Sequence, residues 1–216
     1  MSVAVDLRVH TEPKFRKHWL ERRRATVALL MLTPALFATL GSPSPLVLHS
    51  GWGLLANVLG WLLFLSGAAL RFWATLYVGG RKGDALVDSG PYSITRNPLY
   101  LGSILIALSC GCFLHSATLL AAMIPAGVMY LWFTLQSEAR RLREKHGSRY
   151  DDYCRRVPML WPDWRQWQSE ATLEVDLHCL HIEAFRALRW LSVPLVTIVV
   201  MQLRTASWWP VWFNVP

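Results

Sequence analysis

One apolar run in this sequence begins with a cluster of tyrosine, arginine, asparagine and proline residues. The stretch GPYSITRNPLYLGS, residues 90–103, places Tyr92, Arg96, Asn97 and Tyr100 around an expected helix start. Free backbone N–H groups and the positive end of the helix dipole suit a carboxylate or phosphate there. Two tyrosine rings also suit a cationic ligand. The alternative is an interfacial anchor, because Tyr and Arg are common at membrane boundaries.

A second polar cluster, QSEARRLREKHGSRYDDY over residues 136–153, follows another apolar run. Glu138 stands at the end of that run, with Arg140, Arg141 and Arg143 just after it. A carboxylate at membrane depth is costly, so it tends to be paired or functional. Its simplest partner is Arg141, three residues further along a surface helix. A functional role for Glu138 and a plain ion pair both stay open at this point.

The apolar runs that carry these clusters predict a polytopic membrane protein. Of the 216 residues, 53% are hydrophobic and 17% are charged, which is too apolar for an ordinary soluble domain. A fifth run, Trp190–Leu203, is about 14 residues long and could lie in the interface, re-enter or span. The predicted fold class is all-α, with four to five membrane helices. The four longer runs have about 16–19 residues each, near the length that crosses the hydrocarbon core, and are Ala25–Leu40, Trp52–Leu70, Leu99–Leu114 and Ala117–Leu135.

The basic residues predict how these helices are oriented. The 22 Lys and Arg residues lie mostly in residues 1–24, 79–97 and 137–189, which four spans from a cytoplasmic N-terminus place on one side. The net charge of +8 then indicates contact with anionic lipid headgroups rather than nucleic acid. The polar N-terminal segment lacks the pattern of a cleavable signal. We therefore predict a multi-pass protein of the bacterial inner membrane or the endoplasmic reticulum.

Residues at the expected helix boundaries predict how the clusters are positioned. Pro98 suits the first turn of a helix, and Gly102 allows close approach of a ligand or of another helix. Only His115 and Ser116 separate the third and fourth apolar runs, which predicts a tight helical hairpin. The fourth helix is expected to continue past the membrane as an amphipathic basic helix that ends at Gly147.

The chain divides into a basic N-terminal segment (1–24), a membrane core (25–163) and an amphipathic and hydrophobic C-terminal extension (164–216). Arg71 lies near the cytoplasmic end of the second helix, where a long side chain can snorkel to the surface. The sequence HCLH, residues 178–181, has two His three residues apart, which we interpret as a partly exposed helix face. No metal site is predicted.

Two motifs in a fixed order carry a family resemblance. ALVDSGPYSITRNPLYLGS, followed by SEARRLREKHGSRYDDYCRRVP, is similar to the pattern L-V-x-x-G-P-Y-x-x-x-R-H-P-x-Y-x-G and then E-E-x-x-L-x-x-x-F-G-x-x-Y-x-x-Y. In this the chain resembles the isoprenylcysteine carboxyl methyltransferase family, which forms a wider group with the phospholipid N-methyltransferases. The resemblance covers about Leu70 to Pro158.

The resemblance implies an integral membrane enzyme that uses S-adenosylmethionine and acts on a lipophilic small molecule or lipid. It also implies that helices on the cytoplasmic side, toward the C-terminal end of the chain, bind this cofactor. The cofactor-binding residues that it implies are Leu86, Val87, Gly90, Tyr92, Arg96, Asn97, Pro98, Tyr100, Gly102, Glu138 and Leu142.

Two departures from the family pattern leave the substrate open. Asn97 stands where the carboxyl methyltransferases usually have His, and Ala139 replaces the second Glu. We expect a carboxyl or other small lipophilic acceptor, with a phospholipid amine as the alternative. Outside the methyltransferases, a sterol-reductase-like oxidoreductase that uses NADPH and a membrane scaffold without activity are the alternatives.

The chemistry of the acceptor decides which residues are needed beside the cofactor. A carboxylate is already a nucleophile at neutral pH and needs only a cation to orient it, for which Arg141 or Arg143 is a candidate. A protonated amine must first lose a proton, so Glu138 would act as general base. In both cases Tyr100 and Glu138 are expected near the reacting atoms, and Glu138, Arg141 and Tyr100 are the predicted catalytic residues.

Overall fold

The structure, a computed structural model, describes residues 19–43, 51–79, 86–170 and 177–213, with the backbone alone for 19–22. These described residues form helices and no β-strand, which confirms the predicted all-α fold class. Most of the predicted segment 1–24 lies outside them. In chain order the helices are α1 (Trp19–Leu40), α2 (Gly51–Val78), α3 (Pro91–Ile94), α4 (Pro98–Phe113), α5 (Ala117–His146), α6 (Ser148–Arg156), the 3-10 helix η2 (Trp164–Gln166), α7 (Leu177–Trp190) and α8 (Ser192–Leu203).

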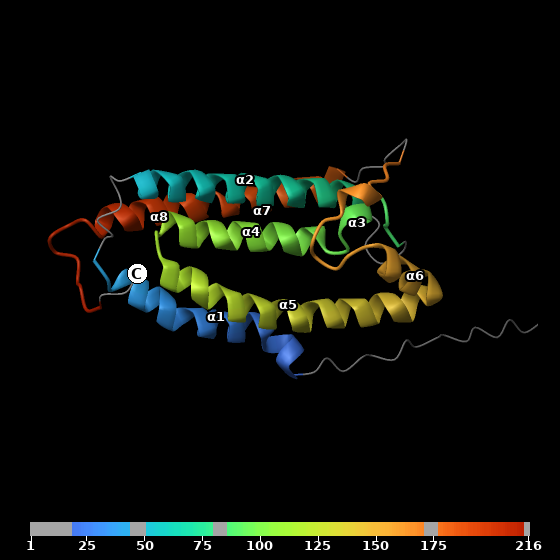
Figure 1. The fold of residues 1–216 in the computed structure, drawn as a ribbon, viewed down its shortest axis with the longest axis horizontal. Coiled ribbons are helices and arrows are strands. Elements are labelled where there is room, and N and C mark those ends of the chain that lie inside the picture. The colour runs from blue at the N-terminus through green and yellow to red at the C-terminus, as the bar shows by residue number, and fades with distance from the viewer. Residues whose placement is uncertain (1–18, 44–50, 80–85, 171–176, 214–216) are drawn as a thin grey trace, which may run out of the picture.

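The helices form two layers (Figure 1). α2, α4, α7 and α8 lie together in one layer, α1 and α5 lie side by side in the other, and α3, α6 and η2 gather at one end. Within the first layer α2 packs on α4 and α7, and α8 packs on α4. The C-terminal part of the chain thus contributes α7 and α8 to the layer that contains α2 and α4.

Glycines bring α2 and α4 into close contact. A Cβ atom at Gly67 would lie 2.6 Å from the carbonyl oxygen of Gly102, and a Cβ atom at Gly102 would lie 2.7 Å from that of Gly67. Small residues permit this approach of backbones between membrane helices. The sequence predicted that Gly102 allows close approach of either a ligand or another helix. In the structure it is the helix α2 that approaches Gly102.

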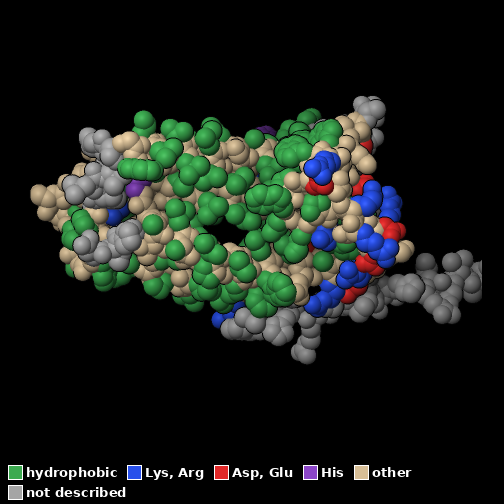
Figure 2. All heavy atoms as spheres, in the orientation of Figure 1, with side chains coloured by type: hydrophobic (Ala, Val, Ile, Leu, Met, Phe, Trp, Pro, Cys, Tyr) green, Lys and Arg blue, Asp and Glu red, His purple; other side chains and the backbone are tan. Residues whose placement is uncertain are grey.

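Apolar helices of membrane-spanning length make up most of the molecule. α8 continues α7, so the fifth apolar run of the sequence is part of a stretch of 27 residues. Hydrophobic side chains cover the middle of the molecule in Figure 2, whereas most Lys, Arg, Asp and Glu gather at the end that holds α6. The segments long and apolar enough to cross a membrane are Arg23–Leu40, Gly51–Val78, Ala117–His146 and Leu177–Leu203.

The hairpin and the long fourth helix are confirmed. α4 and α5 are joined by a short turn in which His115 has φ 49° and Ser116 Oγ accepts a hydrogen bond from the backbone N–H of Leu119 at 3.1 Å. α5 has 30 residues, about 45 Å, and ends before Gly147. α4 has 16 residues, about 24 Å. Because both helices meet at the turn, α5 extends well past the start of α4.

Candidate active site

The two polar clusters of the sequence meet at the start of α4. Tyr100, in the first turn of α4, donates a hydrogen bond from its hydroxyl to Glu138 Oε2 on α5 at 2.8 Å. In the described part of the chain, no ion pair joins Glu138 to Arg141. Arg143, the other candidate cation, pairs instead with Asp151 at 2.7 Å. A tyrosine from another helix is therefore the partner of this carboxylate.

A cleft of about 480 Å³ opens beside this pair. Its walls come from the segment 86–92, the start of α4, and α5 between residues 134 and 145, with two tyrosines of α6. This volume lies within the usual range of small-molecule sites, about 300–1,000 Å³. The residues of the predicted site that line the cleft are Leu86, Val87, Tyr92, Arg96, Asn97, Tyr100, Glu138, Arg141 and Leu142.

The three other residues of the predicted site shape the backbone around the cleft. Gly90 has φ 58°, and a Cβ atom there would lie 2.3 Å from the ring of Tyr77. Pro98 is buried at the first position of α4. Gly102 contacts α2, where a Cβ atom would also lie 2.6 Å from Arg71 Cγ. These residues hold the walls in place without lining the cleft.

The segment 157–168 fastens the start of α4, a contact that no motif predicted. The backbone N–H of Arg96 donates to the carbonyl oxygen of Pro158 at 2.9 Å. The side chain of Asn97 donates from Nδ2 to the carbonyl oxygen of Met159, also at 2.9 Å. Asn97, at the position where the carboxyl methyltransferases usually have His, thus anchors this segment to the cleft.

Three tyrosines near the cleft keep their protons at neutral pH. The hydroxyl of Tyr153 donates to the carbonyl oxygen of Tyr92 at 2.8 Å. Burial raises the pKa of Tyr153, and burial together with the negative charge of Glu138 raises the pKa of Tyr92. Burial and a hydrogen bond with Cys154 raise the pKa of Tyr150 to about 12. These phenols therefore act as neutral hydrogen-bond donors.

An apolar cluster forms part of the cleft wall. Leu86, Tyr150 and Tyr153 are buried together, and Ala139 and Leu142 of α5 pack against them. Ala139 stands at the position of the family's second Glu. The small apolar side chain at this position therefore packs in the core, and Glu138 alone supplies a carboxylate at the end of the apolar run.

Basic side chains outnumber acidic ones around the cleft. Arg24 reaches it from α1 and donates from Nη1 to Ser137 Oγ at 3.3 Å. The surplus of cations gives the cleft a positive potential, which attracts anionic groups. The charged residues that line the cleft are Arg24, Arg96, Arg140, Arg141 and Lys145 on the basic side, and Glu138 and Glu144 on the acidic side.

A buried ion pair behind the cleft was missed by the sequence reasoning. The expected snorkelling of Arg71 is wrong, because its side chain is only 15% exposed and donates from Nη2 to Glu183 Oε1 of α7 at 2.9 Å. Its Nη1 donates to Ser103 Oγ at 2.6 Å and to the carbonyl oxygen of Leu99 at 3.2 Å. Arg71 therefore ties α7 to the first turn of α4. A lone acidic residue within the apolar stretch 177–203 was the available signal.

The described part of the chain contains no group of three or more His, Cys, Asp or Glu side chains that could hold a metal ion. His181, in the HCLH sequence, is exposed on α7, and its ring stacks on that of Phe185 with 5.1 Å between centroids. This placement agrees with the partly exposed helix face expected there.

Comparison with known proteins agrees with the resemblance. The sequence model of the phospholipid methyltransferase family matches residues 49–149. The chain is 31% identical to a nickel-cobalt-cadmium resistance protein of Alcaligenes xylosoxydans xylosoxydans over 68% of each chain. It is 32% identical to a cobalt-zinc-cadmium resistance protein of Cupriavidus metallidurans, over 64% of this chain and 63% of that relative.

A third relative carries a methyltransferase name. The chain is 30% identical to methanethiol S-methyltransferase 2 of Bradyrhizobium diazoefficiens, over 74% of this chain and 69% of that relative. No solved structure matches. Together with the four apolar helices of spanning length, these matches show that the chain belongs to the phospholipid methyltransferase family of integral membrane proteins.

Proposed function

We propose that this protein transfers a methyl group from S-adenosylmethionine to a lipophilic acceptor at the cytoplasmic membrane boundary. The observation that carries the proposal is the Tyr100–Glu138 pair, which faces a cleft of about 480 Å³ at the polar end of the membrane helices. We assign this end to the cytoplasm because most of the Lys and Arg side chains seen in Figure 2 gather there, and basic segments stay on the cytoplasmic side.

The side chains of the cleft fit this cofactor. Arg96 lines the cleft, and no carboxylate pairs with it among the described residues. The surplus of cations suits a carboxylate, Leu86 and Leu142 suit an aromatic base, and Glu138 and Tyr92 suit a sulfonium. When bound, S-adenosylmethionine supplies an electrophilic methyl group. These residues would hold it, and the apolar cluster to which Leu86 and Leu142 belong would exclude water from that wall.

The protein's own residues orient the acceptor and, where needed, take its proton. The positive cleft favours an acceptor that arrives as an anion, so we propose a carboxylate acceptor oriented by Arg141. The methanethiol S-methyltransferase relative favours a thiol as second candidate, because a thiolate is also stabilised by nearby cations. For a thiol or a phospholipid amine, Glu138 would accept the proton, with Tyr100 holding its carboxylate in place.

Methyl transfer from labelled S-adenosylmethionine into membrane lipids tests the proposal. We expect Glu138→Gln and Tyr100→Phe to lower the rate, whereas Asp152→Asn, which removes an exposed carboxylate outside the cleft, leaves it unchanged. For a general base the loss is about 10²–10⁴-fold. Label released by mild alkali as methanol identifies a methyl ester and hence a carboxyl acceptor. Label that resists alkali identifies a sulfur or nitrogen acceptor.

Binding of S-adenosylhomocysteine separates the remaining alternatives. Saturable binding that weakens in Arg96→Gln supports the cleft as the cofactor site. Absence of both label transfer and binding in the folded protein would refute the proposal and favour a scaffold. Reduction of a lipid by NADPH would refute it in favour of an oxidoreductase.

A further inference from the structure

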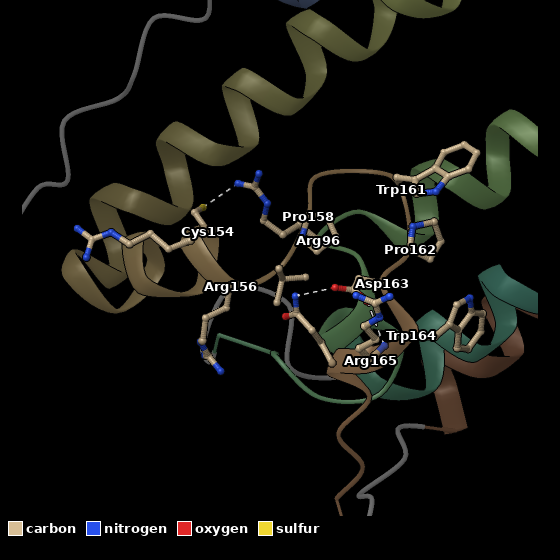
Figure 3. A pocket seen from close by; sticks show the side chains of 12 residues that line it. Arg96, Cys154, Arg156, Pro158, Trp161, Pro162, Asp163, Trp164 and Arg165 are labelled. Atoms are coloured by element: carbon tan, nitrogen blue, oxygen red, sulfur yellow. Dashed lines mark hydrogen bonds between the residues drawn. The ribbon is translucent and has the colours of Figure 1, made fainter.

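A second pocket, lined mostly by the segment 157–168, differs from the cleft in its lining. It has a volume of about 680 Å³ and lies between the end of α6 and η2. Figure 3 shows arginine side chains on several sides of it and two tryptophans together on one side. We call it the arginine–tryptophan pocket, after the lining residues Arg96, Arg155, Arg156, Arg165, Trp161 and Trp164.

The arginines of this pocket lack strong counter-ions. Its lining has one carboxylate, Asp163, which accepts hydrogen bonds from the backbone N–H of Arg165 at 3.1 Å and from Gln166 Nε2 at 3.2 Å (Figure 3). Arg155 and Arg156 make exposed ion pairs at 3.4 and 3.5 Å, of a kind that contributes little. These guanidinium groups are therefore free to exchange a weak partner for a strong one.

Of the four arginines, Arg96 gives the clearest evidence for a missing anionic partner. Its Nη1 donates to the sulfur of Cys154 at 2.9 Å, and sulfur is a weak acceptor. Its Nε is buried without a partner, and no carboxylate pairs with Arg96 among the described residues. A planar guanidinium left in this state is suited to a phosphate, which it can bind through two hydrogen bonds.

The tryptophans place the pocket at the level of lipid headgroups. Trp161 is 86% exposed and Trp164 is 66% exposed, and Trp164 stacks on Trp73 near the end of α2 with 6.5 Å between ring centroids. Exposed indoles of this kind are enriched at the boundary between membrane and water. Basic pockets at this level bind anionic lipid headgroups.

We infer that the arginine–tryptophan pocket binds the phosphate of an anionic phospholipid from the surrounding leaflet. The phosphodiester would lie among the arginines, with the two indoles against the glycerol and upper acyl chains. This inference does not depend on the proposed methyl transfer. Among the residues that line this pocket, Arg96 alone also lines the Tyr100–Glu138 cleft, and the test below leaves Arg96 unchanged.

A titration in nonionic detergent micelles tests it, with short-chain phosphatidylglycerol as probe and phosphatidylcholine as the zwitterionic comparison. We expect Arg155→Gln/Arg165→Gln to weaken phosphatidylglycerol binding about 30-fold, since each cation near the surface contributes about 1 kcal/mol. Arg149→Gln removes an exposed arginine of α6 that does not line the pocket, and should leave binding unchanged. Unaltered elution and helical circular dichroism identify folded variants.

Two outcomes would overturn the inference. Equal affinity of the folded double variant and the wild type for phosphatidylglycerol would show that the pocket is not the site. Displacement of the lipid by inorganic phosphate or glycerol phosphate at concentrations as low as those of phosphatidylglycerol would show a site for a soluble phosphate instead. Stronger binding of phosphatidylglycerol than of either soluble phosphate supports a bilayer source.

Discussion

Removing the charge of Glu183 should strongly destabilise the protein, although this residue does not line the cleft. The side chain of Glu183 is 2% exposed and holds Arg71 through bonds of 2.9 and 3.1 Å to Oε1. Glu183→Gln keeps the shape but leaves the Arg71 guanidinium buried without a counter-ion. Breaking one half of a buried pair costs about 3–5 kcal/mol, so we expect a loss of that size in the free energy of unfolding.

Arg186 provides the matched control. It donates from Nη1 to Glu183 Oε2 at 3.0 Å, but its side chain is 42% exposed. Arg186→Gln should therefore cost less than about 1 kcal/mol. Arg71→Met/Glu183→Leu should recover most of the loss, because an apolar pair replaces the ion pair at similar volume.

Unfolding in mixed detergent micelles, followed by circular dichroism, measures these differences. Methyl transfer by the same variants reports on the cleft, because Arg71 also holds the carbonyl oxygen of Leu99, next to Tyr100. If Glu183→Gln costs no more than Arg186→Gln, the pair does not behave as buried and the reasoning is wrong.

The remaining predictions concern helix packing and pH. Gly102→Leu places carbon atoms where even a Cβ lies 2.7 Å from the carbonyl oxygen of Gly67, so we expect a loss of about 1–3 kcal/mol or more. Gly127→Ala, where nothing lies within 4 Å, should leave Tm almost unchanged, and equal Tm values for the two variants would contradict the close contact. The folded pKa of Tyr150, about 12, lies above the ordinary tyrosine value of 10.0, so the stability that this proton contributes is present below about pH 10 and is lost as pH rises through about 12. Tyr150→Phe should therefore reduce the fall of Tm between about pH 9 and about pH 11, and an unchanged fall would argue against this phenol.

Local chemistry made the helix boundaries predictable. Pro98 fits the first turn of a helix because it lacks an N–H, and the structure starts α4 there. The polar pair His115 and Ser116 is too short to be anything but a turn between two apolar runs. Gly147 ends α5 with a positive φ, as a glycine at a helix end often does.

Contacts between distant residues were not predictable from one sequence. Arg71 and Glu183 are 112 residues apart, and nothing local distinguishes an arginine that snorkels from one that turns inward to a partner. The same holds for Asn97, whose bond to the backbone of Met159 depends on how the segment 157–168 folds back. Tyr100 and Glu138 were expected near one another because the family motifs bring them together, but their direct hydrogen bond emerged only from the structure.

The shortness of α4 ties the Tyr100–Glu138 pair to the thickness of the bilayer. α4 has 16 residues, about 24 Å, while the hydrocarbon core is about 30 Å thick. The length of α4 therefore fixes how far the pair lies from the other end of this helix, whereas the lipids fix the level of the headgroups. Longer acyl chains would sink it beneath the headgroups, and shorter chains would raise it into water. Acyl-chain length would then govern whether the pair meets a soluble cofactor and a lipid-borne acceptor at the same level.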